Sequence, residues 1–222
     1  MQITYEGHSC FKLKGKQGTV VMDPFSEEIG LPLGRMTADI VTISHHHFDH
    51  NNLEKVKGSE GRGEAGPLVI DAAGAYESGG VSVFGVRTWH DAAEGADRGA
   101  NIVFTVYIDG LNVCHLGDLG QVLTPEQVAE IGEIDVLMMP VGGTFTIGPK
   151  EAIEVAKMLN PAFVIPMHYR TPLHKVENFG DLVTLEAFLN EYGMAPEAVA
   201  KLDVDKARLP EETELVVMSK EA

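Results

Sequence analysis

The stretch that most constrains this chain is Asp39–His50, which reads Asp-Ile-Val-Thr-Ile-Ser-His-His-His-Phe-Asp-His. A short apolar, β-branched run breaks there into four histidines and an aspartate within six residues. Such a run is typical of a buried strand, and side chains at its carboxyl end collect at one edge of a sheet. We therefore predict a strand that delivers metal ligands to its carboxyl end.

The spacing within this stretch favours a metal site over a chance run of histidines. Residues two apart in an extended segment point the same way, so His45 and His47 can converge on one ion. Asp49 and His50, at the turn into the next segment, can reach a second ion. By the same alternation His46 points away, and we interpret it as a non-ligand. Imidazoles with a carboxylate suit zinc and also manganese or iron, so these residue types leave the metal open.

A two-ion site needs ligands from other strand ends, and three residues have that position. His90, Asp118 and His168 each follow a predicted strand. Each one alone could equally be a hydrogen-bonded strand-end residue, but together they complete the number of ligands. Asp23 also ends a strand, before Pro24, and is expected either to orient a ligand histidine through its other ring nitrogen or to be a turn residue.

Strand patterns come first along the chain, and strands alternate with helices later. A meander of short antiparallel strands is predicted over 3–23, followed by strands over 68–70, 81–89, 101–108, 111–116, 136–141, 163–165 and 214–218. Helices are predicted from a capping box at Thr124 and over 149–159 and 181–192, with a loop over 26–36, a short helix over 51–56 and a glycine-rich turn over 58–66. This order predicts two packed sheets with helices outside them, in one domain of residues 1–222.

The motifs around these residues resemble those of metallo-β-lactamase-fold hydrolases. They are Gly7-His8-Ser9, Asp23-Pro24-Phe25, Ser44 to His50, His90, Gly117-Asp118, Pro140 to Thr146 and Pro166 to Tyr169. The resemblance runs from Ile3 to about Pro172 and is nearest to small metal-dependent hydrolases that include ascorbate-phosphate lactonase-like proteins. The N-acyl-phosphatidylethanolamine phospholipase D type is more distantly similar. The resemblance implies an α+β fold, the four-layer αββα sandwich.

The resemblance also implies a ligand set and a reaction. It would place His45, His47 and His90 on a first metal, Asp49, His50 and His168 on a second, and Asp118 between them. Two divalent ions, Zn²⁺ or else Mn²⁺ or Fe²⁺, would activate water to attack an ester, lactone or phosphodiester of a small molecule. Asp49 would have the catalytic role of orienting that water and taking up its proton.

Two alternative functions, from other classes of protein, stay open. A di-iron redox protein of the same fold would need more carboxylate ligands and an electron-transfer partner, and the histidine-rich first site argues for hydrolysis instead. A non-catalytic metal-binding or interaction protein is also compatible with the sequence. The chain has no Gly-x-Ser-x-Gly elbow, phosphate-binding loop or dinucleotide fingerprint.

Net charge and cysteine content limit the kinds of partner and the cellular compartment that we expect. The formal charge is −16, from 33 acidic against 17 basic side chains, which argues against nucleic acid as a partner. Cys10 and Cys114 lie in separate apolar runs and are expected to be free. The chain shows neither a signal-peptide pattern nor an apolar run that approaches a membrane span, so a cytoplasmic protein is expected. The sequence does not indicate an oligomeric state.

Side chains near the predicted ligands leave the substrate open. Arg98, Arg170 and His174 could meet an anionic substrate, or they could be plain solvated surface residues. His8 could face the pocket or only close a tight turn. The sequence thus predicts a small-molecule substrate, leaves open whether it is anionic, and does not name it.

Overall fold

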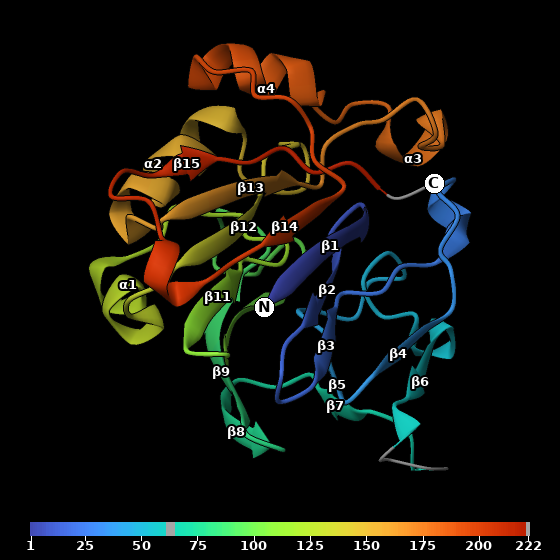
Figure 1. Ribbon diagram of the computed structural model, residues 1–222. Coiled ribbons are helices and arrows are strands. Elements are labelled where there is room, and N and C mark those ends of the chain that lie inside the picture. The colour runs from blue at the N-terminus through green and yellow to red at the C-terminus, as the bar shows by residue number, and fades with distance from the viewer. Residues whose placement is uncertain (61–64, 221–222) are drawn as a thin grey trace.

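Two large β-sheets and one small one make up the framework of the computed structural model, which describes residues 1–60 and 65–220 (Figure 1). The first sheet has the order β14 (Lys201–Asp203), β1 (Gln2–Gly7), β2 (Cys10–Lys14), β3 (Thr19–Met22), β5 (Ile40–Thr42) and β7 (Leu68–Ile70). The second has the order β15 (Glu214–Leu215), β13 (Phe163–Met167), β12 (Val136–Pro140), β11 (Leu111–His115), β10 (Ala100–Ile108), β9 (Val81–Trp89) and β8 (Gly74–Ser78). β4 (Met36–Ala38) pairs in parallel with β6 (Val56–Gly58).

Strand direction brings distant segments to one edge of the molecule. In the first sheet β1 and β3 are each antiparallel to β2, and β5 is parallel to β3, so β1, β3 and β5 run the same way. In the second sheet β9 and β11 are each antiparallel to β10, and β12 and β13 continue parallel to β11. The segments that follow these strands therefore leave each sheet at a single edge, which is where ligands collect in such sheets.

The main apolar core lies between the two sheets and continues beneath the helices. Phe11 and Leu13 on β2 and Phe104 and Val106 on β10 are fully buried members of this core. The interior strand β12 is buried at every residue, as expected for a strand covered on both faces. A smaller second core, which includes Phe25, lies on the first sheet.

Helices α1 (Pro125–Ile131), α2 (Pro149–Leu159) and α4 (Leu185–Tyr192) accompany the second sheet, whereas α3 (Val176–Phe179) lies beside the turn at Glu27–Ile29 (Figure 1). The capping box predicted at Thr124 is present, because the Thr124 hydroxyl accepts from the Gln127 backbone N–H and the Gln127 side chain bonds back to the cap. In the described part of the chain, 3₁₀ turns at Glu27–Ile29 and Leu53–Lys55 and the β4–β6 pair lie beside the first sheet.

The prediction of two packed sheets with helices outside them is confirmed, and the differences are local. The segment predicted as a short helix over 51–56 is instead a single 3₁₀ turn followed by β6. The helix predicted over 181–192 begins only at Leu185, because the hydroxyl of Thr184 accepts from the Ala187 N–H and sets the cap there. The last predicted strand is regular only over Glu214–Leu215, and Met218 forms an isolated bridge with Val199. The glycine-rich turn over 58–66 falls partly outside the described residues.

Two further sequence expectations concern the cysteines and the membrane. Cys10 and Cys114 are both buried and free, as predicted. Across the described residues, none of the helices combines the length and the apolar character that crossing a bilayer requires.

Candidate metal centre

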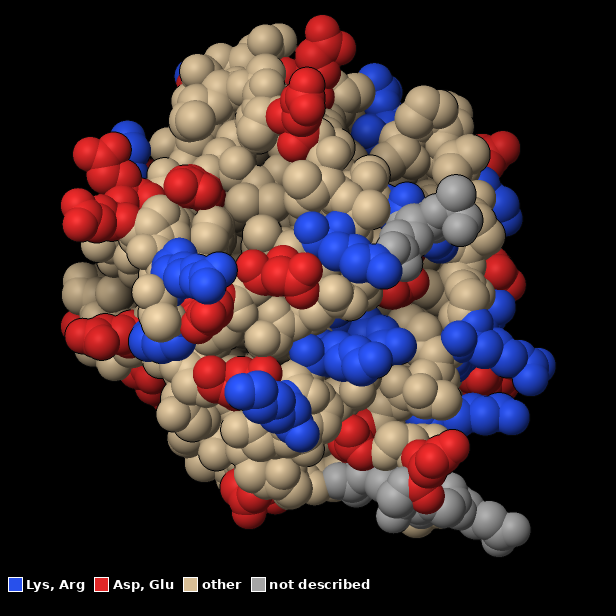
Figure 2. All heavy atoms as spheres, viewed as in Figure 1, with Lys and Arg blue, Asp and Glu red and all other residues tan. Residues whose placement is uncertain are grey.

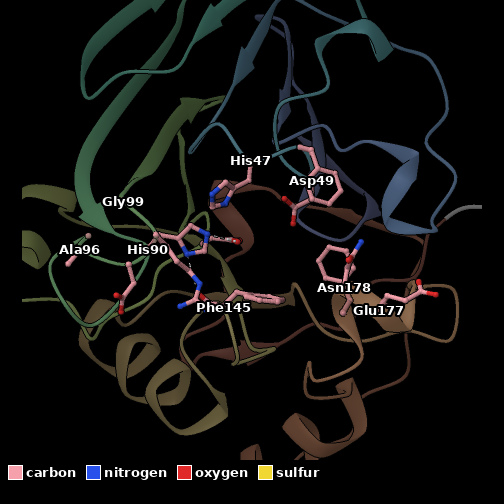
Figure 3. Close-up of a pocket in the computed structure, with 14 residues that line it drawn as sticks. His47, Asp49, His90, Ala96, Gly99, Phe145, Glu177 and Asn178 are labelled. Atoms are coloured by element: carbon pink, nitrogen blue, oxygen red, sulfur yellow. Dashed lines mark hydrogen bonds and ion pairs between the residues drawn. The ribbon is translucent and has the colours of Figure 1, made fainter.

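Six short segments at the carboxyl ends of strands supply the side chains of the centre. The supplying strands are β1, β3 and β5 in the first sheet and β9, β11 and β13 in the second, and the residues are His8, Asp23, His45 to His50, His90, Asp118 and His168. Figure 3 shows His47, Asp49 and His90 around one hollow, with Phe145 below them. The strand-end argument therefore brings together side chains from both sheets.

Three of these residues have a backbone conformation that side chains other than glycine rarely adopt. His8, Asp23 and His168 have φ of 54°, 45° and 54°. A left-handed conformation costs of order 1 kcal/mol or more for such residues, and it persists where the surrounding structure imposes it. Each of the three directly follows its strand, so the turn that ends the strand also aims the side chain.

Three histidines form the first ligand group. The ring nitrogens of His45, His47 and His90 lie within 4.8 Å of one another, which is close enough for one ion. His45 and His90 are buried, and His47 is exposed to the cavity side. His90 donates from Nδ1 to the Phe145 carbonyl at 3.1 Å, which leaves its Nε2 free to bind a metal.

A second group lies beside the first. Asp49, His50 and His168 place one candidate ligand atom each within 4.8 Å of the others, and His8 belongs to the same cluster by distance. The rings of His50 and His168 are nearly parallel, with centroids 5.8 Å apart. This group contains the residues that the resemblance assigned to a second metal, together with one that it did not.

Asp118 lies between the two groups. Its Oδ1 is 3.3 Å from His50 Nε2, and its Oδ2 is 3.3 Å from His90 Nε2 and 3.2 Å from His168 Nε2. The two oxygens of one carboxylate thus face histidines of both groups. Asp118 is therefore placed to contact a cation held by either group.

Buried polar atoms without partners show that the residues present fit a metal. Among the described residues, His45 Nε2, His50 Nε2, Asp118 Oδ1 and His168 Nε2 are buried and lack a hydrogen-bond partner. Leaving such atoms unsatisfied costs about 1–3 kcal/mol each, so native proteins pair them. All four atoms face one another at the centre, and imidazole nitrogen and carboxylate oxygen are the donors that divalent zinc binds.

Asp23 fixes the ring orientation in both groups. Its Oδ2 accepts from His50 Nδ1 at 2.9 Å and also from the Ser44 hydroxyl. Because that hydroxyl donates its hydrogen to Asp23, it accepts from His45 Nδ1, at 2.9 Å. His45 and His50 therefore both present Nε2 to the centre. The sequence predicted Asp23 as a candidate for this role but did not predict the part of Ser44.

The electrostatics of the centre favour a bound cation. Burial lowers the pKa of His50, yet Asp118 and Asp49 beside it raise that pKa well above its usual value. Burial alone would raise the pKa of Asp118, but His168 and His50 hold it well below the usual value. The carboxylates thus stay ionised and attract positive charge, which a divalent ion supplies without a proton.

Comparisons with known proteins place the chain in a family. A family model described as a β-lactamase superfamily domain matches residues 2–168. The chain belongs to the metallo-β-lactamase superfamily. A protein of this superfamily from Thermotoga maritima, named as a Zn-dependent hydrolase, is 45% identical with a TM-score of 0.79, and the match covers 99% of both chains.

Curated relatives point to the metal-dependent hydrolases of the superfamily. A "UPF0173 metal-dependent hydrolase" of Methanoculleus marisnigri is 33% identical over 187 residues, covering 77% of this chain and 82% of the relative. One of the same description from Pyrobaculum neutrophilum is 31% identical over 229 residues, covering 91% of this chain and all of the relative. The chain accordingly belongs to a family of the metallo-β-lactamase superfamily whose curated members are named metal-dependent hydrolases, and its αββα fold is the one that the motifs implied.

All seven residues predicted as ligands come together in this superfamily member. They are His45, His47, Asp49, His50, His90, Asp118 and His168. His46 is exposed and faces Asp71 instead, with 3.4 Å between His46 Nε2 and Asp71 Oδ2, as its expected role of non-ligand requires. Arg170 is exposed and donates to the Gly180 carbonyl.

Sequence reasoning missed the carboxylate that organises the loop beside the centre. Asp91 accepts four backbone N–H groups, with Oδ1 taking those of Ala93 and Gly95 and Oδ2 those of Asp97 and Arg98. The signal was an aspartate immediately after a predicted ligand and before a glycine-containing loop. This loop forms one side of the cavity over the centre.

Proposed function

We propose that this chain hydrolyses an ester, lactone or phosphodiester of a small anionic molecule with a dinuclear centre, most simply of zinc. The observation that carries the proposal is Asp118, whose two oxygens face histidines of two separate groups. A single structural ion would need about four ligands, whereas seven candidate ligands converge here.

The chemistry divides between the ions and the protein. Two divalent cations at such a centre lower the pKa of water and polarise the oxygen that is attacked. His45, His47 and His90 would hold one, and Asp49, His50 and His168 the other, with Asp118 shared. Asp49 and Asp118 also line the cavity. Asp49 is therefore the carboxylate placed to orient the attacking water and to accept its proton.

The cavity indicates a substrate of limited size with an apolar part. Its volume is about 720 Å³, within the range of small-molecule sites. Phe48, Phe145 and Phe179 line it, and the rings of Phe145 and Phe179 meet edge to face at 6.2 Å between centroids. A flat or aliphatic group can pack against these rings while a polar group reaches the centre.

Arg98 supports an anionic substrate. Among the described residues that line the cavity it is the one Lys or Arg, and its guanidinium lies 5.5 Å from the centroid of the Phe145 ring. The Arg98 backbone N–H donates to Asp91, which fixes the position in the loop from which the Arg98 side chain extends. On the face that Figure 2 shows, Lys and Arg are interspersed with Asp and Glu, which favours a small anion over a nucleic acid.

Metal analysis joined to a substrate panel tests the function. We expect about two divalent ions per chain after saturation with zinc and turnover of at least one ester, lactone or phosphodiester. Asp118→Ala should lose activity by at least about a thousandfold, since it removes a ligand of both ions. His46→Ala is the matched control, because it removes an exposed histidine of the same run and should keep both metal and activity.

Three outcomes would contradict the proposal. One ion per chain at saturation would exclude the dinuclear centre. Two ions with no turnover across the panel would favour a non-catalytic metal-binding protein. Preferential iron loading with reversible oxidation and no hydrolysis would favour the di-iron alternative.

The role of Arg98 has its own test. With an active substrate in hand, Arg98→Met should raise KM about 10- to 100-fold for an anionic substrate and change KM little for a neutral analogue. Arg98→Lys keeps the charge and should recover part of the loss. An equal effect of Arg98→Met on both substrates would show that Arg98 does not recognise the anion.

A further inference from the structure

Asp49, His8 and His174 form a chain of hydrogen bonds that runs outward from the metal centre. His8 Nε2 is 3.1 Å from Asp49 Oδ2, and His8 Nδ1 is 3.2 Å from His174 Nε2. His174 Nδ1 accepts the backbone N–H of Thr171 at 3.0 Å. His8 follows β1 and His174 lies between β13 and α3, so these hydrogen bonds join segments 166 residues apart. All three side chains are buried.

One end of this chain of hydrogen bonds has a fixed polarity. A backbone N–H can only donate, so His174 Nδ1 is an acceptor and the hydrogen of the neutral ring is on Nε2. His174 therefore donates to His8 Nδ1. With Nδ1 occupied as an acceptor, the hydrogen of His8 is on its Nε2, and His8 donates to Asp49 Oδ2.

This polarity requires both rings to be neutral, because one nitrogen of each ring accepts a hydrogen bond. Burial, and after it His168, lowers the pKa of His174 to about 4. Each hydrogen bond in the chain from Thr171 to Asp49 can therefore be donated in only one direction.

We propose that His174 is a positioning residue that holds His8 in the tautomer protonated at Nε2, so that His8 anchors Asp49 and is not itself a metal ligand. By distance alone His8 would qualify as a fourth ligand of the second group, since it lies with Asp49, His50 and His168. A nitrogen that carries a hydrogen has no lone pair for a metal. The inference rests on the proposed metal centre only for the role of Asp49; the tautomer follows from the protein alone.

The consequence for Asp49 is a restrained carboxylate. Its Oδ2 accepts the N–H of His8 and also lies 3.6 Å from His50 Nε2. Restraints of this kind on a ligating carboxylate typically change metal affinity by 10- to 100-fold when they are removed. His174 reaches Asp49 only through His8.

Two substitutions at position 174 distinguish the effect of the N–H donor from the effect of losing the imidazole ring. The side-chain NH₂ of glutamine can reach the place of His174 Nε2, so His174→Gln keeps a donor to His8. Asparagine reaches only to the place of Nδ1, so His174→Asn loses that donor. The pair is matched in polarity and differs in the one hydrogen bond that the proposal invokes.

The first experiment is ¹⁵N NMR of the histidine rings in the metal-free full chain, with His8 assigned from a His8→Gln variant. We expect His8 to be protonated at Nε2 in the unsubstituted protein and in His174→Gln, and to shift toward the Nδ1–H tautomer in His174→Asn. An Nδ1–H tautomer in the unsubstituted protein would overturn the proposal. Because this readout needs neither metal nor turnover, it is independent of the proposed function.

The second experiment is zinc titration against a competing chelator. We expect His174→Asn to bind its weaker ion 10- to 100-fold less tightly and His174→Gln to stay within about threefold of the unsubstituted protein. His8→Gln keeps an N–H toward Asp49 but has no imidazole, so it should still bind both ions. Loss of one ion in His8→Gln would show that His8 is a ligand and would refute the proposal, even if the position 174 variants fail to fold.

Discussion

Asp23 is the residue on which both halves of the centre depend. It contacts His50 directly and His45 through the hydroxyl of Ser44, and it also accepts the Ser44 backbone N–H at 2.8 Å. One buried carboxylate therefore sets the tautomer of a histidine in each group. A substitution at Asp23 should therefore affect both His45 and His50, whereas a substitution at Ser44 should affect mainly His45.

We predict that Asp23→Asn weakens the binding of both ions by about 10- to 100-fold, because it removes the acceptor on which both rings depend. Ser44→Ala removes only the link to His45 and should weaken one ion while the other keeps its affinity. Zinc titration with a chelating dye measures both constants. Equal effects of the two substitutions would contradict this division.

His174 gives a pH dependence of stability whose sign follows from its burial. Its pKa falls to about 4 in the folded chain from an ordinary 6.5, chiefly through burial. Between these values the unfolded state binds more protons, so acidification through this window lowers the free energy of unfolding. Metal-free protein should thus lose more stability than His174→Gln between about pH 7 and about pH 5 in urea unfolding. Parallel pH profiles for the two proteins would refute this.

Residue identity and spacing predicted the ligands, but not what holds them. His45, His47 and Asp49 are recognisable because they occur in one short run with the alternation of a strand. Ser44 bonds to Asp23 at the end of the neighbouring strand, and His8 bonds to His174 in a segment that follows the other sheet, so these contacts depend on strand order and on sheet packing. No local pattern carries that information.

At the scale of elements, the loop after β9 is shaped by one side chain. The Asp91 carboxylate accepts hydrogen bonds from four backbone N–H groups, of which that of Arg98 is the last along the chain. These four bonds add to backbone hydrogen bonds within the loop, such as that from the Gly99 N–H to the Gly95 carbonyl.

We predict that Asp91→Ala abolishes the protection of these four amides against hydrogen exchange and raises KM, with metal content unchanged. Asp97→Asn is the control, because it removes a charge from the same loop and leaves the four hydrogen bonds in place. Hydrogen exchange read by NMR gives each amide separately. Unchanged protection in Asp91→Ala would show that the loop is ordered by other contacts.

The turn after β11 packs its backbone against the turn after β9. A Cβ on Gly120 would lie 2.3 Å from the His90 carbonyl carbon and from the Asp91 backbone nitrogen. These are backbone atoms that cannot rotate away, so only glycine fits this position. The approach brings Asp118 and His90 together.

Gly120→Ala should therefore lower the free energy of unfolding by about 2 kcal/mol or more, and should weaken binding of the ion that His90 contacts. Gly34→Ala is the control, since a Cβ there meets nothing within 4 Å. That variant should be neutral or more stable by up to about 1 kcal/mol. Urea unfolding of the metal-free proteins measures both, and a neutral Gly120→Ala would contradict the close approach.

Element type was more predictable than element ends. The run over 149–159 has a proline at its start and an asparagine at its close, and the structure reproduces both bounds. In contrast, Asp181 was expected to start the last helix, but the segment before Thr184 packs Leu182 into the second core instead. Tertiary burial decided that boundary, and the sequence pattern does not report it.

For the whole molecule, the centre links the two sheets. The backbone N–H of His168 donates to the His8 carbonyl at 2.9 Å, and the ligands on either side come from different sheets. A metal held by both sheets would bind the folded chain more tightly than the unfolded one. That difference in binding free energy would therefore add to the stability of the entire fold.

Chelation should lower the melting temperature accordingly. An ion at a hundredfold excess over its Kd adds about 2.7 kcal/mol, which corresponds to roughly 5–10 °C for a chain of this size. Calorimetry with and without chelator measures the loss. Asp118→Ala should show a smaller loss than the unsubstituted protein, and His46→Ala an equal one. A melting temperature that chelator does not change would contradict metal binding by the folded state.

The ligands also span most of the chain, from His45 to His168, and none of the strands that deliver them pairs across the two sheets. Contacts of such long sequence separation form late, because loop closure costs entropy before the contact repays it. The first ligand run can meet an ion early, yet the second half of the coordination sphere waits for the sheets to dock. Each group also takes a histidine from the second sheet, His90 in one and His168 in the other, so neither group is complete until the two sheets have docked.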